Sequence, residues 1–215
     1  MTNNKGITYT VISCLAIISM VIGLFVYSTV AEKELTKDQY KLLKFYQLNT
    51  KRELTPFSLL NNDKPFTQDN LTGKWDLVFL GFASCPDMCP MTMRKLAMTA
   101  DILKKDPEVL KKINFIILSI DPDRDSSKTM SEYAEAFNPS FIGLSGGIKD
   151  IYQLSLNLTL PFTPIIDSDE KNYDMDHSMN LALIGPDGKY FGFFKTPHKP
   201  EDMAEVLESV VKFSN

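Results

Sequence analysis

An uncharged stretch near the amino terminus most constrains how this chain can fold. No charged residue occurs from Gly6 to Ala31, and the centre of the stretch reads VISCLAIISMVIGLFVY. A helix of this length crosses the roughly 30 Å hydrocarbon core of a bilayer. The sequence therefore predicts one transmembrane anchor at residues 7–31, after a short tail at residues 1–6.

The same stretch allows two other interpretations. A cleavable signal peptide would place small residues such as Thr29 and Ala31 near the cut, but the apolar run is long for a signal peptide. A lipid on Cys14 would leave only a very short apolar stretch before that cysteine. We expect the uncleaved anchor.

Residues 32–54 are polar and charged, and we expect them to form a helical or loose stalk. Their scattered apolar residues could share one helical face: Leu35, Leu42, Leu43 and Tyr46. A folded domain is expected from 55 to 215, which is long enough to bury a core. The net charge of −4 makes a nucleic-acid partner unexpected.

Apolar segments alternate with amphipathic segments through the domain. Buried strands are expected at 77–82 and 113–120, because continuous apolar runs suit a sheet covered on both faces. Helices are expected at 91–105, 128–137, 148–156 and 201–213, and further strands at 141–144, 180–184 and 190–194, with a hairpin around Asn61, Asn62 and Asp63. This order predicts an α/β fold with a thioredoxin-like mixed sheet flanked by helices.

Two cysteines stand where a predicted strand meets a predicted helix. Cys85 and Cys89 occur in CPDMCP, soon after the strand expected at 77–82. Free N–H groups and the helix dipole at a helix start favour thiolate over thiol. Buried, inert cysteines are the simpler alternative, and a structural zinc site would need four ligands, where only one distant histidine offers a third. We expect a dithiol that reacts or binds metal.

His177 is the histidine expected to join the two cysteines. It lies just before the strand at 180–184. In a thioredoxin-like fold this loop lies against the amino-terminal end of the helix that carries the cysteines. Two thiolates and one imidazole form a soft ligand set that suits Cu(I) and can also hold Cu(II). Asp176 is a candidate acceptor that would orient the ring. His198, in TPHKP, is expected to be a solvated loop residue.

Four successive motifs resemble those of the SCO/SenC family. They are GKWDLVFLGFASCPDMCP, ILSIDPDRDS, GLSGG and DHSMNLALIGPDGKY, and the resemblance runs from about Thr55 to the carboxyl end. The resemblance implies a copper-binding thioredoxin fold that helps to mature the binuclear copper centre of a respiratory cytochrome c oxidase. It also implies that Cys85, Cys89 and His177 are the copper ligands.

The resemblance implies a location as well. It implies a single-pass protein of a bacterial cytoplasmic membrane, with the carboxyl-terminal domain on the outer, periplasmic side and the copper-bearing oxidase subunit as partner. Lysines alone favour the opposite side, because only Lys5 precedes the span, whereas four lysines follow it. Long domains translocate largely regardless of charge, so we expect the outer side.

Three functions remain open for the dithiol. The leading hypothesis is a copper chaperone. The alternative is a thiol–disulfide reductase that keeps the oxidase subunit's copper-ligand cysteines reduced while Cys85 and Cys89 cycle through a disulfide. A peroxide or redox sensor is a third, but CPDMCP does not resemble a peroxidase loop. A requirement for His177 separates the first two functions.

Two further patterns near these motifs are set aside. Acidic residues stand at positions 1, 3, 5 and 12 of an EF-hand-like loop: Asp121, Asp123, Asp125 and Glu132. Position 6 is Ser126, where that loop requires glycine, so we expect a turn and a helix cap. Three methionines lie near the cysteines: Met91, Met93 and Met98. A helix that faces a core uses methionine anyway, so no metal role is assigned to them.

Overall fold

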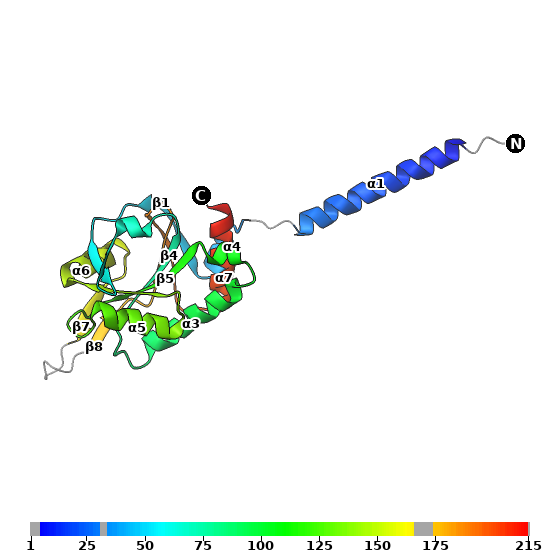
Figure 1. The fold of residues 1–215 in the computed structure, drawn as a ribbon. Coiled ribbons are helices and arrows are strands. Elements are labelled where there is room, and N and C mark those ends of the chain that lie inside the picture. The colour runs from blue at the N-terminus through cyan, green and yellow to red at the C-terminus, as the bar shows by residue number, and fades with distance from the viewer. Residues whose placement is uncertain (1–4, 31–33, 166–173, 215) are drawn as a thin grey trace. The chain divides into compact units, whose positions relative to one another are not determined.

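The computed structural model describes residues 5–30, 34–165 and 174–214, which fall into two compact units divided after Glu34. The amino-terminal unit contains one helix, α1 (Lys5–Val30), drawn in blue in Figure 1. Its segment Gly6–Phe25 is long and apolar enough to cross a membrane. The predicted apolar helix is therefore confirmed.

The second unit is built on one mixed sheet of eight strands, in the order β1-β10-β9-β4-β5-β6-β2-β3. Its centre is parallel: β4 (Trp75–Gly81) pairs with β5 (Ile113–Ser119), which pairs with β6 (Ile142–Gly146). The other pairings are antiparallel and involve β1 (Phe45–Arg52), β2 (Ser58–Asn61), β3 (Lys64–Thr67), β9 (Leu181–Ile184) and β10 (Tyr190–Phe194). Every residue of β4 is buried, as the continuous apolar run predicted.

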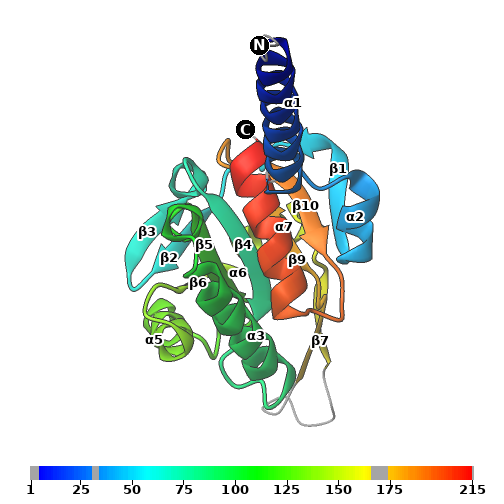
Figure 2. The same cartoon turned by 90° about the vertical axis from the view of Figure 1, so that its right-hand side faces the viewer.

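Helices cover both faces of this sheet. Figure 2 shows α3 (Met88–Leu103), α5 (Ser127–Phe137) and α7 (Pro200–Phe213) on the near face, and α6 (Ile148–Asn157) behind the sheet. The unit also contains two short helical turns, η1 (Gln68–Leu71) and α4 (Pro107–Leu110). This arrangement confirms the predicted α/β class with a mixed, helix-flanked sheet.

The segment expected to be a stalk is part of the folded unit. It forms α2 (Lys37–Leu42) and then β1, which pairs with β10 at one edge of the main sheet. Phe45 is fully buried, and the Tyr40 hydroxyl lies 3.0 Å from Ser209 Oγ in α7. The compact unit therefore begins at Leu35 and not near Thr55.

A second, two-stranded sheet lies apart from the main one. It consists of β7 (Phe162–Ile165) and β8 (Asp174–His177), which pair antiparallel with Phe162 opposite His177. These strands were not expected from the sequence. The hairpin matters because β8 ends at His177, and Figure 1 shows it beside α6 and α5.

Candidate metal centre

The two cysteines occupy different positions at the end of β4. Cys85 lies in the loop between β4 and α3 and is half-buried, whereas Cys89 lies in the first turn of α3 and is fully buried. The Cys85 N–H donates to the Phe82 carbonyl (3.3 Å), and the Cys89 N–H donates to Cys85 Sγ (3.4 Å). The sulfur of Cys85, the outer of the two cysteines, therefore accepts a hydrogen bond from one of the free N–H groups at the helix start.

The absence of a side chain at Gly81 makes room for the inner sulfur. A Cβ atom at Gly81 would lie 3.0 Å from Cys89 Sγ and 3.0 Å from a ring carbon of Phe79. Real Cβ atoms seldom approach so closely, so the end of β4 needs glycine to hold Cys89 in this position. Gly81 was not among the site residues expected from the sequence. A glycine inside a buried strand, next to a cysteine motif, is the signal that could have found it.

The buried environment acts on the protonation of Cys89. Burial is the largest effect, followed by the hydrogen bond with Cys85, and both raise the pKa of the Cys89 thiol far above its ordinary value. Burial thus opposes, at Cys89, the thiolate form that the helix start was expected to favour. A soft metal ion that binds this sulfur must displace its proton.

The hairpin brings the predicted histidine to the buried cysteine. His177 Nε2 lies 3.8 Å from Cys89 Sγ. His177 Nδ1 lies 3.1 Å from the Ser178 carbonyl oxygen, which can only accept a hydrogen bond. Nδ1 therefore carries the hydrogen, and the lone pair of Nε2 faces the Cys89 sulfur. The ring packs edge-on against Phe79 and Phe82, with centroid distances of 5.9 and 6.3 Å.

The ring of His177 is oriented by backbone rather than by the expected carboxylate. Its Nδ1 partner is the carbonyl of Ser178, whose own N–H donates to Pro161 O. Asp176, which we expected to orient the ring, is exposed and pairs across the hairpin with Thr163. A carbonyl contact fixes the tautomer as effectively as a carboxylate does.

His198 is buried, so the expectation of a solvated loop residue is wrong. Its Nε2 donates to the Met179 carbonyl at 2.7 Å, which ties the segment after His177 to the loop before α7. Burial lowers the pKa of His198, so this ring stays neutral at physiological pH. His198 thus joins Met179 to the loop before α7.

The three predicted residues are gathered but not yet arranged as a complete ligand set. Within residues 5–30, 34–165 and 174–214, no group of three or more His, Cys, Asp or Glu side chains stands ready to hold a metal ion. Cys89 and His177 already face each other, whereas Cys85 Sγ accepts the Cys89 N–H. A metal site with all three requires the Cys85 side chain to turn towards the other two.

Open space adjoins the histidine side. A pocket of about 390 Å³ borders the ring and is lined by Pro161, Phe162, Thr163, Asp176, His177 and Ser178. A larger groove of about 770 Å³ lies between the hairpin, α6 and the loop after β5, with Met175, Tyr152 and Pro122 in its walls. The imidazole is therefore reachable from outside, whereas Cys89 is not.

The methionines near the cysteines divide into two groups. Met93 is buried in the core, as expected for a helix that faces a sheet. Met91 and Met98 are about half-exposed, so the core explanation fails for these two. The described structure gives neither of them a contact with the candidate site.

The fold and the site together define a class of protein. A mixed sheet with a dithiol at the start of the helix after β4, and an imidazole facing its inner sulfur, is a thioredoxin-like domain with a candidate thiolate–imidazole centre.

The comparisons with known proteins place the chain within that class. The SCO1/SenC family model matches residues 46–212, so the chain belongs to the SCO1/SenC family. An SCO2-like protein of Rickettsia conorii is 32% identical over 203 residues, which cover 93% of this chain and 97% of the relative.

Solved structures agree with this assignment. Arabidopsis thaliana ScoI with copper bound is 30% identical, with a TM-score of 0.67, over 74% of this chain and 98% of that chain. Bradyrhizobium japonicum ScoI with copper bound is 31% identical, with a TM-score of 0.64, over 73% and 98%.

Proposed function

We propose that this protein is a copper chaperone that takes part in cytochrome c oxidase assembly. Copper is its cargo, held by Cys85, Cys89 and His177 and delivered to the copper-bearing oxidase subunit. One observation carries the proposal: His177 Nε2 faces Cys89 Sγ at 3.8 Å with its tautomer fixed by the Ser178 carbonyl. Relatives in the same family have been solved with copper bound, which supports the choice of metal.

The ligand set suits both oxidation states of copper, in different ways. Thiolates are soft ligands that select Cu(I), and two sulfurs suffice for it. Cu(II) is harder and benefits from the imidazole nitrogen. The cysteines therefore account for retention of the ion, and His177 accounts for its ability to remain bound after oxidation.

The proposed location follows from the apolar helix and the family. We place α1 across a bacterial cytoplasmic membrane, with the domain on the outer side where the oxidase copper centre is assembled. The count of lysines on the two sides of the span favours the reverse orientation. Reporter fusions at the carboxyl end test this directly, and a cytoplasmic signal would reject the proposed side.

A thiol–disulfide reductase is the second candidate, and the difference in exposure between the sulfurs favours it. Cys85 is half-buried and Cys89 is fully buried, an arrangement that suits an attacking and a resolving thiol. Exchange depends on thiolate fraction, leaving group and access, so it needs no imidazole ligand. The two functions therefore differ in their need for His177.

The decisive experiment replaces His177 in cells that are limited for copper. His177→Ala is expected to lose oxidase maturation while the purified protein still forms and reduces its disulfide. His198→Gln is the matched control, because it removes the other imidazole but retains a donor for the Met179 carbonyl. Full oxidase activity in the His177→Ala strain would reject the chaperone and favour the reductase.

A further inference from the structure

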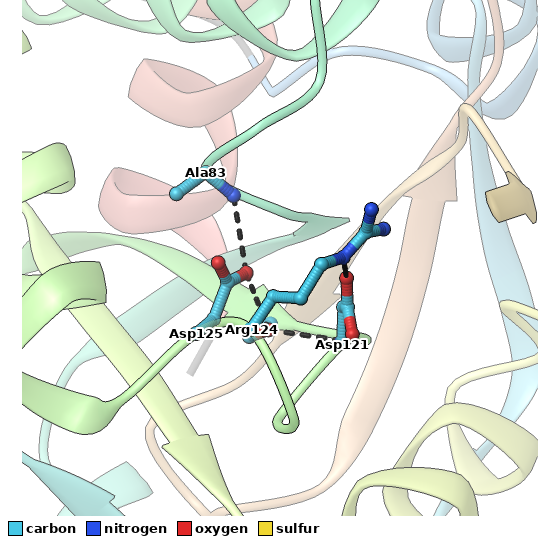
Figure 3. Close-up of polar contacts among 5 residues, drawn as sticks. Ala83, Asp121, Arg124 and Asp125 are labelled. Atoms are coloured by element: carbon cyan, nitrogen blue, oxygen red, sulfur yellow. Dashed lines mark hydrogen bonds and ion pairs between the residues drawn. The ribbon is translucent and has the colours of Figure 1, made fainter. Parts of the chain in front are cut away.

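The loop between β5 and α5, residues 121–125, lies against the loop that carries the cysteines. Asp125 is only 2% exposed, and its Oδ2 atom accepts the Ala83 N–H at 3.0 Å and the Ser119 hydroxyl at 2.8 Å. Figure 3 shows the carboxylate of Asp125 directed at the backbone of Ala83. The contact joins two segments about 40 residues apart in sequence, and Ala83 stands two residues before Cys85.

Asp125 is itself held in place from the next strand. Its backbone carbonyl accepts the Ser145 hydroxyl of β6 at 2.6 Å, and its N–H donates to the Asp121 carbonyl at 2.9 Å. Burying a carboxylate is costly unless its oxygens are hydrogen-bonded. The arrangement therefore anchors the cysteine loop to the parallel centre of the sheet through one side chain.

The neighbouring arginine reaches the other half of the site. Arg124 Nε donates to the buried Asp121 carboxylate, and its guanidinium lies 5.7 Å from the centre of the Phe82 ring. Phe82 accepts the Cys85 N–H through its carbonyl and packs its ring against His177. Arg124 thus lies over Phe82, a residue that contacts both Cys85 and His177.

We propose that the 121–125 loop is a clamp that positions the metal ligands, in which Asp125 fixes the cysteine loop through Ala83 and Arg124 fixes the His177 ring through Phe82. The copper readout of this inference rests on the proposed function, whereas its structural readout does not. Neither residue is a ligand. The loop that resembles an EF-hand in sequence serves the site by internal contacts: its first and fifth residues are buried, and Ser126 caps α5 by accepting the Thr129 N–H.

The first experiment uses the full-length protein in detergent micelles, selectively labelled with ¹⁵N-alanine. Asp125→Ala is expected to lose the slow hydrogen exchange of the Ala83 amide. It is also expected to weaken Cu(II) binding by about 10- to 100-fold, the usual effect of removing an outer partner of a ligand, and to shift the thiolate-to-Cu(II) absorption band. Asp125→Asn keeps an oxygen acceptor for Ala83 and should restore both signals.

Two controls separate positioning from general stability and charge. Ser155→Ala removes a buried serine hydroxyl that donates to the Tyr152 carbonyl within α6. Asp123→Ala removes the same charge from an exposed position in the same loop. Both variants should keep the Ala83 protection and the Cu(II) absorption band of the unmodified protein.

The outcomes that would overturn the clamp are specific. If Asp125→Ala lost the slow hydrogen exchange of the Ala83 amide but kept the Cu(II) spectrum unchanged, Asp125 would have no influence on the metal site. An equal loss in Ser155→Ala would reduce Asp125 to a structural role. If Asp125→Ala does not fold, Arg124→Met decides: it should alter the histidine-dependent Cu(II) spectrum, and an unaltered spectrum would overturn the clamp.

Failure of the proposed function would look different. If the unmodified protein bound no copper, the chaperone proposal would fall. The Ala83 amide would still report on Asp125, and an unprotected Ala83 in the unmodified protein would overturn the clamp itself.

Discussion

The cysteine side and the histidine side of the candidate centre are built from different kinds of structure. Cys89 lies at the start of a sixteen-residue helix, against the buried end of β4, with no exposed surface. His177 lies at the end of a four-residue strand in a separate two-stranded sheet, beside open pockets. The sulfur is fixed by the core of the domain, and the imidazole by a hairpin and a backbone carbonyl.

In the proposed copper site, this difference would place the two kinds of ligand on supports of unequal firmness. Cu(I), the softer ion, prefers thiolate, and Cys89 is the ligand that core packing holds most firmly. Cu(II), the harder ion, benefits from the imidazole of His177, which lies on the two-stranded sheet β7–β8. Two-stranded sheets have little stability of their own. The following predictions test this division, in order of decreasing effect on copper binding.

The largest effect is expected from the cysteine side. The double variant Cys85→Ser, Cys89→Ser should lose stoichiometric Cu(I) binding completely, because serine oxygen is a poor ligand for a soft ion. Titration of the reduced protein with a competing Cu(I) chelator measures this. Retention of one bound Cu(I) by the double variant would refute the site.

The next effect is expected from the histidine side and should depend on oxidation state. His177→Ala should weaken Cu(II) binding by more than the roughly 10- to 100-fold typical of losing an outer partner, because a ligand itself is removed. Cu(I) can remain between two sulfurs, so its loss should be smaller. Equal losses for both ions would contradict the proposed division, and His198→Gln provides the control.

A smaller effect is expected from crowding the inner sulfur. Gly81→Ala places a Cβ atom 3.0 Å from Cys89 Sγ, and such overpacking costs about 1–3 kcal/mol of folding free energy. We expect a lower melting temperature and a shifted Cu(II) absorption band. Gly147→Ala is the matched control, since the nearest atom to its Cβ would be 3.7 Å away. A Gly81→Ala protein with an unshifted band would show that Cys89 tolerates displacement.

Asp76 lies at the end of β4 opposite to Gly81, and replacing it is expected to leave copper binding unchanged. Asp76 is fully buried, and burial raises its pKa to about 7, only partly offset by the hydrogen bond from Asn114. Its Oδ2 atom has no hydrogen-bond partner within the described part of the chain. This carboxyl group therefore acts on stability rather than on the site.

The sign of the Asp76 effect follows from its raised pKa. The folded state holds the proton up to about pH 7, whereas the unfolded state releases it near its ordinary value of 3.8. The stability contributed by this group is full below that value and is lost as pH rises towards 7. Asp76→Asn should flatten urea-unfolding free energies over this range by up to a few kcal/mol. An unchanged pH profile would show that Asp76 is not the responsible group.

The fold class and the position of the two cysteines after a buried strand were predictable because they depend on local patterns. Buried parallel strands read as continuous apolar runs, and the strand–cysteine–helix order is visible in sequence. The helix expected at 201–213 is α7, and its apolar residues Met203, Val206 and Leu207 are buried.

The remaining elements depend on contacts between distant segments. β1 is a polar edge strand with one fully buried residue, Phe45, and only its pairing with β10 makes it a strand. The hairpin β7–β8 contains Pro164 and has no apolar alternation to identify it. His198 and Asp125 are polar residues in loops, and nothing in their own segments indicates that the fold buries them.

In the proposed copper site, the unequal exposure of the two sulfurs would set the rate at which copper leaves. A chelate held by two sulfurs dissociates one bond at a time, and an incoming thiol can approach Cys85, which is half-buried, but not Cys89. Exchange then begins at the outer bond while the inner bond prevents escape into solution. A site of this kind can be thermodynamically tight and kinetically labile at once, provided that the competitor is a ligand and not water.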